Sequence, residues 1–282
     1  MKTKHFIGFT TIRAVFRGAG KWRLTTLGVI GLLSALGTGM LFLRSANSAS
    51  ALGPIDGTLD AGTTHYPDLQ TLPPSDVTIE TDATTGQKLL RFSNTIANEG
   101  KGRLEVVPVN NTNGTTDAYQ QISSHDLLGQ WYVVQTRYVG TFAFHPEHNH
   151  WHFEDFARYE LRDVAWDGSI GETVLASSQK VSFCITDSTL VDPYLDHASA
   201  TPQYVYCDQS NPQGISVGWA DTYKWDLAGQ SLDITGLPDG DYWIVSTADP
   251  DNLLDEGGGQ AESNNTAAVS VHITGSTVTV GQ

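Results

Sequence analysis

The chain has 282 residues and a formal net charge of −15. All 31 acidic residues lie beyond residue 51, together with nine basic ones, so this larger part carries a net charge of −22. Such a charge repels nucleic acid and anionic membranes and attracts cations, including amines. The alternative is that this charge only keeps the protein soluble. The length beyond residue 51 suits one large β domain or two small ones.

Residues 1–51 have the composition of a targeting segment. A basic stretch at 1–23 has no acidic residue, a largely apolar run follows at 24–43, and small residues fill 45–51. This order is typical of a secretory signal, and the apolar run is also long enough to span a bilayer as a helix of roughly 20 residues. A cleaved signal peptide and a retained membrane anchor both stay open. Either one places the remaining chain outside the cytoplasm, so we predict a protein that is secreted or anchored at the cell surface.

Beyond this segment, a lead-in at 52–66 is rich in Gly, Pro and Asp, and short apolar runs alternate with turn residues after it. Strand-forming residues dominate these runs, which include 88–92, 104–109, 130–138, 158–161, 181–185, 242–247, 267–274 and 276–280. We therefore predict an all-β fold over residues 67–282, a β-sandwich-like single domain with long loops. The longest irregular stretch, 187–218, is expected to be functional or tied down.

The only two cysteines, Cys184 and Cys207, both lie in the part that we expect to be exported. An even number of cysteines in an oxidising compartment favours one disulfide, which would tie down much of the 187–218 loop. The alternative is a pair of free buried thiols.

Four histidines fall within the eight residues from His145 to His152. The last three, His148, His150 and His152, alternate along the chain, and alternate side chains of a strand share one face. We predict that these three imidazoles converge on a metal ion, with His145 as a fourth ligand or a proton carrier. Glu154 and Asp155 would accept hydrogen bonds from the histidine rings.

The residue types alone leave the metal open. Three nitrogen ligands without a thiolate suit zinc, copper or nickel. Zinc with an open fourth position would indicate a hydrolase or hydratase, whereas copper would indicate redox chemistry with O₂.

Further segments around the histidines resemble the lysyl oxidase family of copper amine oxidases. The resemblance covers about residues 68–273 and is carried by Leu89-Leu90-Arg91-Phe92, Asn98-Glu99-Gly100, the histidine run, Asp155-Phe156, Tyr159-Glu160-Leu161, Lys180-Val181-Ser182-Phe183-Cys184, Gln213-Gly214-Ile215-Ser216, Asp221-Thr222-Tyr223, Leu232-Asp233-Ile234-Thr235, Gly240-Asp241-Tyr242 and Asn264-Asn265. The animal enzymes carry more than the two cysteines found here.

The resemblance implies that copper is the metal and that His148, His150 and His152 are its ligands. It also implies that Lys180 and Tyr223 form a lysyl tyrosylquinone. Lys180 lies beside the apolar Val181, and an apolar setting favours the neutral, nucleophilic amine. If each residue is considered alone, the alternative is that Lys180 is an ordinary surface lysine and Tyr223 a half-buried tyrosine of a sheet.

By the same resemblance the chain would oxidise primary amines, either peptidyl lysine or small amines, to aldehydes with release of ammonia and hydrogen peroxide. A base must remove a proton from the substrate, and the sequence offers Asp155, Asp221 and His145 without deciding among them. A calcium site is a further implication, formed by Asp68 and the Leu69 carbonyl with Glu262, Asn264 and Asn265.

Two other functions stay open. The first is a non-enzymatic copper-binding or adhesion module on the same scaffold, because a fold alone does not give a function. Such a module would need neither Lys180 nor Tyr223, so their presence favours the enzyme. The second is a zinc hydrolase, which would leave that pair unexplained.

Overall fold

The computed structural model describes residues 62–178 and 181–281. The predicted signal or anchor at 1–51, most of the lead-in at 52–66, and Lys180 lie outside the described residues. Within the described ranges, no helix is long and apolar enough to cross a membrane.

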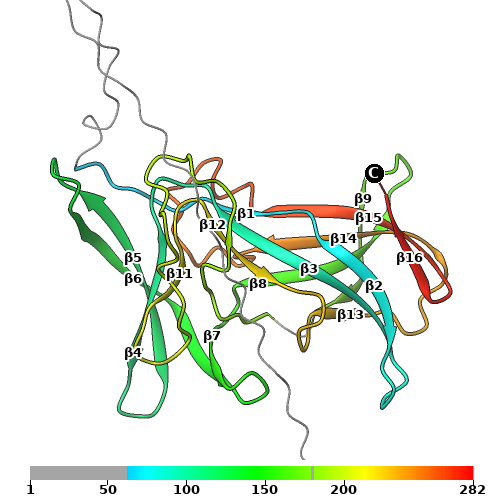
Figure 1. Cartoon of the computed structure of the whole chain (residues 1–282). Helices are drawn as coiled ribbons and strands as arrows, with labels where there is room; N and C mark the ends of the chain where they lie inside the picture. The colour runs from blue at the N-terminus through cyan, green and yellow to red at the C-terminus, as the bar shows by residue number, and fades with distance from the viewer. Residues whose placement is uncertain (1–61, 179–180, 282) are drawn as a thin grey trace, which may run out of the picture. The chain divides into compact units, whose positions relative to one another are not determined.

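The described residues form strands joined by turns and loops and contain no α-helix, so the all-β prediction is confirmed. The strands are β1 (Leu69–Thr71), β2 (Ser75–Thr81), β3 (Lys88–Asn98), β4 (Leu104–Asn110), β5 (Thr116–His125), β6 (Trp131–His145), β7 (His150–Phe153), β8 (Ala157–Val164), β9 (Ile170–Ser177), β10 (Thr189–Leu190), β11 (Gln213–Ile215), β12 (Trp219–Tyr223), β13 (Ser231–Asp233), β14 (Gly240–Ala248), β15 (Thr266–Thr274) and β16 (Thr277–Val280). Figure 1 shows their arrangement.

Two antiparallel sheets pack against each other around the core. One has the order β1-β3-β12-β10, with β2 and β13 also paired to β3, and the other has the order β16-β15-β14-β8-β9. Contacts of β1 with β14 and of β13 with β8 join them. The ring of Phe92 on β3 meets the ring of Tyr159 on β8 at 5.1 Å, edge to face, and both side chains are fully buried. The strands alternate inward and outward side chains, which puts the apolar residues of each sheet on the shared face.

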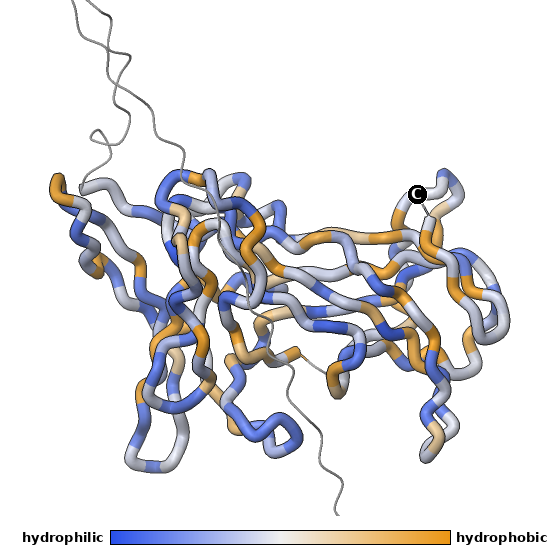
Figure 2. Tube along the Cα trace, viewed as in Figure 1, coloured by the Kyte–Doolittle hydropathy of each residue, from blue (hydrophilic) through white to orange (hydrophobic). Residues whose placement is uncertain are grey.

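The third sheet, in the order β11-β4-β5-β6-β7, positions most of the predicted site. Its longest pair is the β5–β6 hairpin, whose register shifts twice. Strand β6 then turns back into the short β7, where His145 pairs with His150 and Ala143 pairs with His152. Figure 2 shows that the β6–β7 turn is hydrophilic.

Candidate metal centre

The predicted histidine strand is in fact a hairpin. Strand β6 ends at His145, and residues 146–149 form a turn before β7 begins at His150. The backbone N–H groups of His148 and Asn149 both donate to the His145 carbonyl, at 3.1 and 2.8 Å. Asn149 takes the left-handed conformation (φ 56°), which asparagine tolerates better than most residues. The prediction that His148 lies on the same strand as the other two is therefore wrong, because the chain reverses direction there.

The turn nevertheless returns His148 to its two partners. One nitrogen atom from each of His148, His150 and His152 lies within 4.8 Å of the others. The ring centroids are 5.6 Å apart for His148 and His150, 5.1 Å for His148 and His152, and 4.8 Å for His150 and His152. His152 is fully buried, and the other two are half-buried. Three imidazoles at this spacing can hold one transition-metal ion from a partly exposed side.

A second layer of polar groups surrounds these rings. The His145 ring stacks on His152, with centroids 4.2 Å apart and planes 18° apart. The Ser182 hydroxyl lies 3.3 Å from His152 Nδ1 and 3.1 Å from His145 Nε2. Glu154 Oε1 lies 3.2 Å from His145 Nε2. Glu154 thus contacts His145, while Ser182, which the sequence did not single out, orients His152.

Ser182 reaches the histidines because its segment pairs with β7. Phe153 and Phe183 exchange backbone hydrogen bonds of 2.8 and 3.0 Å. An open pocket of about 290 Å³ lies beside this pairing. Two histidines, two acidic side chains and Ser182 contribute to its lining, which consists of His145, Glu147, His148, Glu154, Val181, Ser182, Ala228 and Gly229. The pocket gives a small cationic molecule access to the histidines.

Tyr223 lies at the other end of the same segment. Its hydroxyl donates to the Cys184 carbonyl at 2.9 Å and accepts from the Cys184 N–H at 2.6 Å. Its ring meets Phe183 edge to face at 4.6 Å. Burial and then the nearby charge of Asp221 raise the pKa of Tyr223 well above its ordinary value, so the phenol stays neutral. Residues 182–184 therefore connect the histidines to Tyr223, and the segment begins two residues after Lys180.

The three candidate bases occupy different surroundings. His145 belongs to the histidine cluster. Asp221 is buried on β12, where its charge acts on Tyr223 and Tyr159. Asp155 is exposed between β7 and β8, with a left-handed backbone (φ 59°). Of the three, only His145 lines the pocket at the histidines.

The part of the chain that carries this site is similar to known proteins. The family model described as lysyl oxidase matches residues 134–282, more than half of the chain, including the histidine hairpin and Tyr223. The chain belongs to the lysyl oxidase family. The resemblance predicted from the sequence is thereby confirmed.

Three relatives illustrate the range of similarity within the family. Lysyl oxidase homolog 1 of Homo sapiens is 31% identical over 136 residues, which is 48% of this chain and 21% of that protein. Lysyl oxidase homolog 2 of Xenopus laevis is 30% identical over 178 residues, covering 62% of this chain and 18% of that protein. Protein-lysine 6-oxidase of Sus scrofa is 28% identical over 136 residues, covering 48% of each chain. The matched part thus spans between about a fifth and a half of these family members.

The disulfide prediction is confirmed in this family member. Cys184 and Cys207 are joined, with their Cα atoms 5.6 Å apart. The Trp151 N–H on β7 donates to the Cys207 carbonyl at 2.9 Å. The bridge therefore fixes the long loop beside the histidine hairpin.

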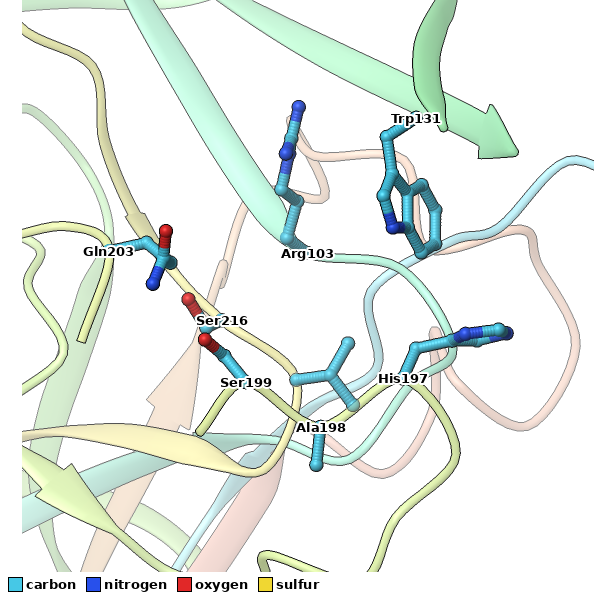
Figure 3. A pocket seen from close by; sticks show the side chains of 8 residues that line it. Arg103, Trp131, His197, Ala198, Ser199, Gln203 and Ser216 are labelled. Carbon is cyan, nitrogen blue, oxygen red and sulfur yellow. The ribbon is translucent and has the colours of Figure 1, made fainter. Parts of the chain in front are cut away.

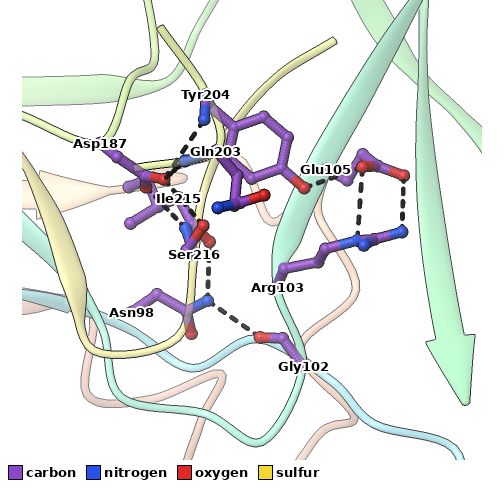
Figure 4. Close-up of polar contacts among 9 residues, drawn as sticks. All are labelled: Asn98, Gly102, Arg103, Glu105, Asp187, Gln203, Tyr204, Ile215 and Ser216. Atoms are coloured by element: carbon purple, nitrogen blue, oxygen red, sulfur yellow. Dashed lines mark hydrogen bonds and ion pairs between the residues drawn. The ribbon is translucent and has the colours of Figure 1, made fainter. Parts of the chain in front are cut away.

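The rest of the long loop is held by a buried carboxylate. Asp187 accepts hydrogen bonds of 2.7 Å from the backbone N–H groups of Gln203 and Ser216 and from the Ser216 hydroxyl (Figure 4). The loop also forms one wall of a second open pocket, beside Arg103 and Trp131 (Figure 3). The expectation that the longest irregular stretch is tied down is confirmed.

Replacing both cysteines by serine is expected to lower the free energy of unfolding by about 3 kcal/mol. The chain-entropy model gives this value for the sequence separation of 23 residues, because the bridge restricts the unfolded chain. Urea unfolding followed by tryptophan fluorescence measures the difference, with reduced native protein as the control. A double variant as stable as the oxidised protein, or two free thiols in native protein, contradicts this expectation.

The five residues of the predicted calcium site fall into one connected region. The Asn264 amide donates to Asp68 Oδ1 at 2.9 Å, and the Asn265 amide donates to Glu256 Oε1 at 2.6 Å. Glu262 Oε1 accepts from the Glu256 N–H at 3.1 Å. The Leu69 N–H donates to Glu256 Oε2. Glu256, which no sequence pattern pointed to, is thus the centre of the region.

Buried oxygen atoms accumulate in this region. Burial, and then the neighbouring charges of Glu262 and Asp249, raise the pKa of Glu256 to about 8. Within the described residues, Glu262 Oε2, Asn264 Oδ1 and Asn265 Oδ1 are buried and accept no hydrogen bond. Buried acceptors of this kind normally have a partner, and a bound cation would provide one.

Proposed function

We propose that this lysyl oxidase family member is a copper- and quinone-dependent amine oxidase. It would convert primary amines, either peptidyl lysine or small amines, to aldehydes and release ammonia and hydrogen peroxide. The observation that carries the proposal is the convergence of His148, His150 and His152 beside the segment that leads to Tyr223. A relative named protein-lysine 6-oxidase supports the substrate class.

The donor set fits copper. Imidazole nitrogens suit copper as well as zinc. If His152 Nδ1–H donates to the Ser182 hydroxyl oxygen, the lone pair lies on Nε2 and points to the metal. Copper and a lysyl tyrosylquinone would together supply a carbonyl group that captures an amine and the redox chemistry with O₂. The proposed source of that quinone is the pair Lys180 and Tyr223, of which only Tyr223 lies within the described residues.

The residues of the pocket would bind and orient the amine. Glu147 and Glu154 line it, and their carboxylates attract a substrate ammonium group. His145 Nε2 also lies there, within 3.2 Å of Glu154. The Glu154 carboxylate can only accept, so Nε2 carries a proton and the lone pair of the neutral ring lies on Nδ1. We assign to the His145 ring, through this lone pair, the removal of a proton from bound substrate, in preference to Asp155 and Asp221, because only His145 lines the pocket.

The disulfide supports an exported location, since such bonds persist in oxidising compartments. We propose that the chain acts outside the cytoplasm, either secreted or held by the apolar run at 24–43. Its partners there would be O₂ and an amine or a lysine-containing protein.

The deciding experiment is peroxide release by the exported chain. Protein purified without metal is loaded with copper in air and offered a panel of primary amines and a lysine-rich protein. We expect peroxide and ammonia in equal amounts, and neither product after copper is removed. A copper-loaded protein that contains the quinone but oxidises no amine would contradict the proposal. A copper-loaded protein without the quinone would support a non-enzymatic copper-binding or adhesion module instead.

We also propose that calcium binds among Asp68, the Leu69 carbonyl, Glu262, Asn264 and Asn265. The three buried oxygens that accept no hydrogen bond from the residues that the structure describes support this site. Their residues lie on the loop before β15, whereas Asp68 and Leu69 are at the start of β1. A cation there would join the two ends of the domain.

Calcium is expected to raise the melting temperature by several degrees relative to protein in chelator. An ion at 100 times its dissociation constant adds about 2.7 kcal/mol to the free energy of unfolding. The substitution Glu262→Gln should remove the increase, whereas Asp251→Asn, at an exposed acid paired with Arg158, should leave it intact. Identical melting curves with calcium and with chelator would contradict the site.

A further inference from the structure

Three other histidines form a second cluster outside the histidine hairpin of β6 and β7. One nitrogen atom from each of His65, His125 and His197 lies within 4.8 Å of the others. The three ring centroids are all 4.9 Å apart. With metal–nitrogen bonds of about 2.0–2.1 Å and tetrahedral angles, imidazole centroids around one ion would lie roughly 5 Å apart. We propose that this cluster is a second transition-metal site, best suited to zinc.

The cluster joins three separate parts of the chain. His65 lies before β1 and forms an isolated bridge with Ser123 of β5, to whose carbonyl its N–H donates at 2.9 Å. His125 is the last residue of β5, and His197 lies in the 187–218 loop. A metal bound by all three would hold the lead-in, the β5–β6 hairpin and the long loop together.

The two nitrogens of His125 have defined roles. Nδ1 lies 3.0 Å from the carbonyl oxygen of Asp126. A carbonyl can only accept, so Nδ1 carries the proton and the lone pair lies on Nε2. In metal-binding histidines the N–H of the second ring nitrogen commonly donates to a backbone carbonyl in this way, or to a carboxylate. His197 has such a carboxylate, because Asp196 Oδ2 lies 3.6 Å from its Nε2.

The backbone beside the cluster is closely packed. A Cβ atom at Gly102 would lie 2.3 Å from the His65 carbonyl oxygen, and one at Gly218 would lie 2.1 Å from the Asp192 carbonyl oxygen. His197 itself has a left-handed backbone (φ 68°). A residue other than glycine rarely adopts this conformation, so the surrounding structure must impose it. The Asp187 hydrogen bonds that hold this loop supply part of that constraint (Figure 4).

Trp131 covers one side of the cluster of His65, His125 and His197, and an open pocket lies on another side. Trp131 pairs with His125 across the hairpin, and its indole lies 5.2–5.3 Å from each of the three rings. His65 and His125 are buried. His197 and Trp131 line the open pocket of about 290 Å³ together with Arg103 (Figure 3). Three protein nitrogens with one open side are a common zinc arrangement, and the pocket gives the ion its entry path.

The test measures how many zinc ions bind per chain after two histidines of the histidine hairpin have been replaced. In a chain carrying His148→Ala and His150→Ala, equimolar zinc is added, excess is dialysed away and bound zinc is measured. We expect one zinc per chain, and cobalt in its place should give the intense visible absorption of tetrahedral coordination. Adding His197→Gln or His125→Gln should remove both signals, whereas His272→Gln, at an exposed histidine paired with Asp241, should keep them.

Thermal unfolding provides a second test, which applies even if one of the variants folds poorly. Zinc should raise the melting temperature of the hairpin-substituted chain by several degrees, and His197→Gln, at the most exposed ligand, should abolish that rise while its circular dichroism stays native. Zinc binding unchanged by His197→Gln and His125→Gln would overturn the proposal, as would no zinc retained by the folded hairpin-substituted chain. The readout is independent of amine oxidation, so failure of the proposed activity would not affect it.

Discussion

Replacing Tyr223 by phenylalanine is expected to abolish quinone formation and to reduce amine-dependent peroxide release by at least about 10³-fold. The scale is that of removing a covalent catalytic group. The substitution removes only the hydroxyl that bonds to Cys184, so the cost in stability should be about 1 kcal/mol. The protein should therefore fold, bind copper and remain inactive. Lys180→Arg should give the same inactive, copper-loaded protein, because a guanidinium keeps the charge but cannot replace the amine.

A matched control separates chemistry from folding. Tyr242 is also buried in a sheet, and its hydroxyl donates to the Pro238 carbonyl at 2.7 Å. Tyr242→Phe should lose similar stability and keep full activity. Phenylhydrazine followed by peptide mapping detects the quinone directly in copper-loaded protein. Unmodified Lys180 and Tyr223 peptides from an active sample would contradict the assignment, as would full activity in Tyr223→Phe.

The sequence predicted the fold class because its local patterns agree with one another. Inward residues such as Leu90, Phe92 and Ile244 alternate with outward ones, and short turns separate the runs. The division into three sheets could not be read from these patterns, since strand pairing such as that of β3 with β12 joins residues more than a hundred positions apart. Disulfide pairing was accessible for a simpler reason, because two cysteines allow only one pair.

Within the proposed copper centre, the sequence identified a local cluster but not its shape. Alternation from His148 to His152 predicted one strand, and the structure has a turn that ends at Asn149. The role of Ser182 depends on pairing between Phe153 and Phe183, which no local pattern encodes. Glu256, at the centre of the proposed calcium region, belongs to no sequence motif, so the sequence did not predict its position there.

The second histidine cluster is even less predictable from local sequence patterns. His65, His125 and His197 are separated by 60 and 72 positions, so nothing in the sequence connects them. Their convergence depends on the β5–β6 hairpin and on the fixed course of the long loop. A site built from such distant positions is visible only once the chain is folded.

Replacing His150 by glutamine is expected to weaken copper binding by more than about 100-fold, since it removes one of three ligands. Removing the outer partner should have a smaller effect, so Ser182→Ala should weaken binding by about 10–100-fold. His152 is fully buried, and its substitution would also disturb packing, which makes half-buried His150 the better test. Copper content after dialysis and electron paramagnetic resonance of Cu²⁺ measure both effects. Unchanged copper affinity in His150→Gln would contradict the ligand assignment.

His145→Gln distinguishes a three-histidine centre from a four-histidine one. His145 stacks on His152, and its Nε2 faces Ser182 and Glu154, which suits an outer role and proton transfer better than ligation. We therefore expect this variant to keep its copper stoichiometry and most of its spectrum while losing turnover of bound amine. The loss should fall on kcat rather than on KM, because the carboxylates that attract the substrate remain. A copper loss as large as that of His150→Gln would instead make His145 a fourth ligand. The proton would then have to pass to Asp155 or Asp221, and of these only Asp221 acts on Tyr223 through its charge.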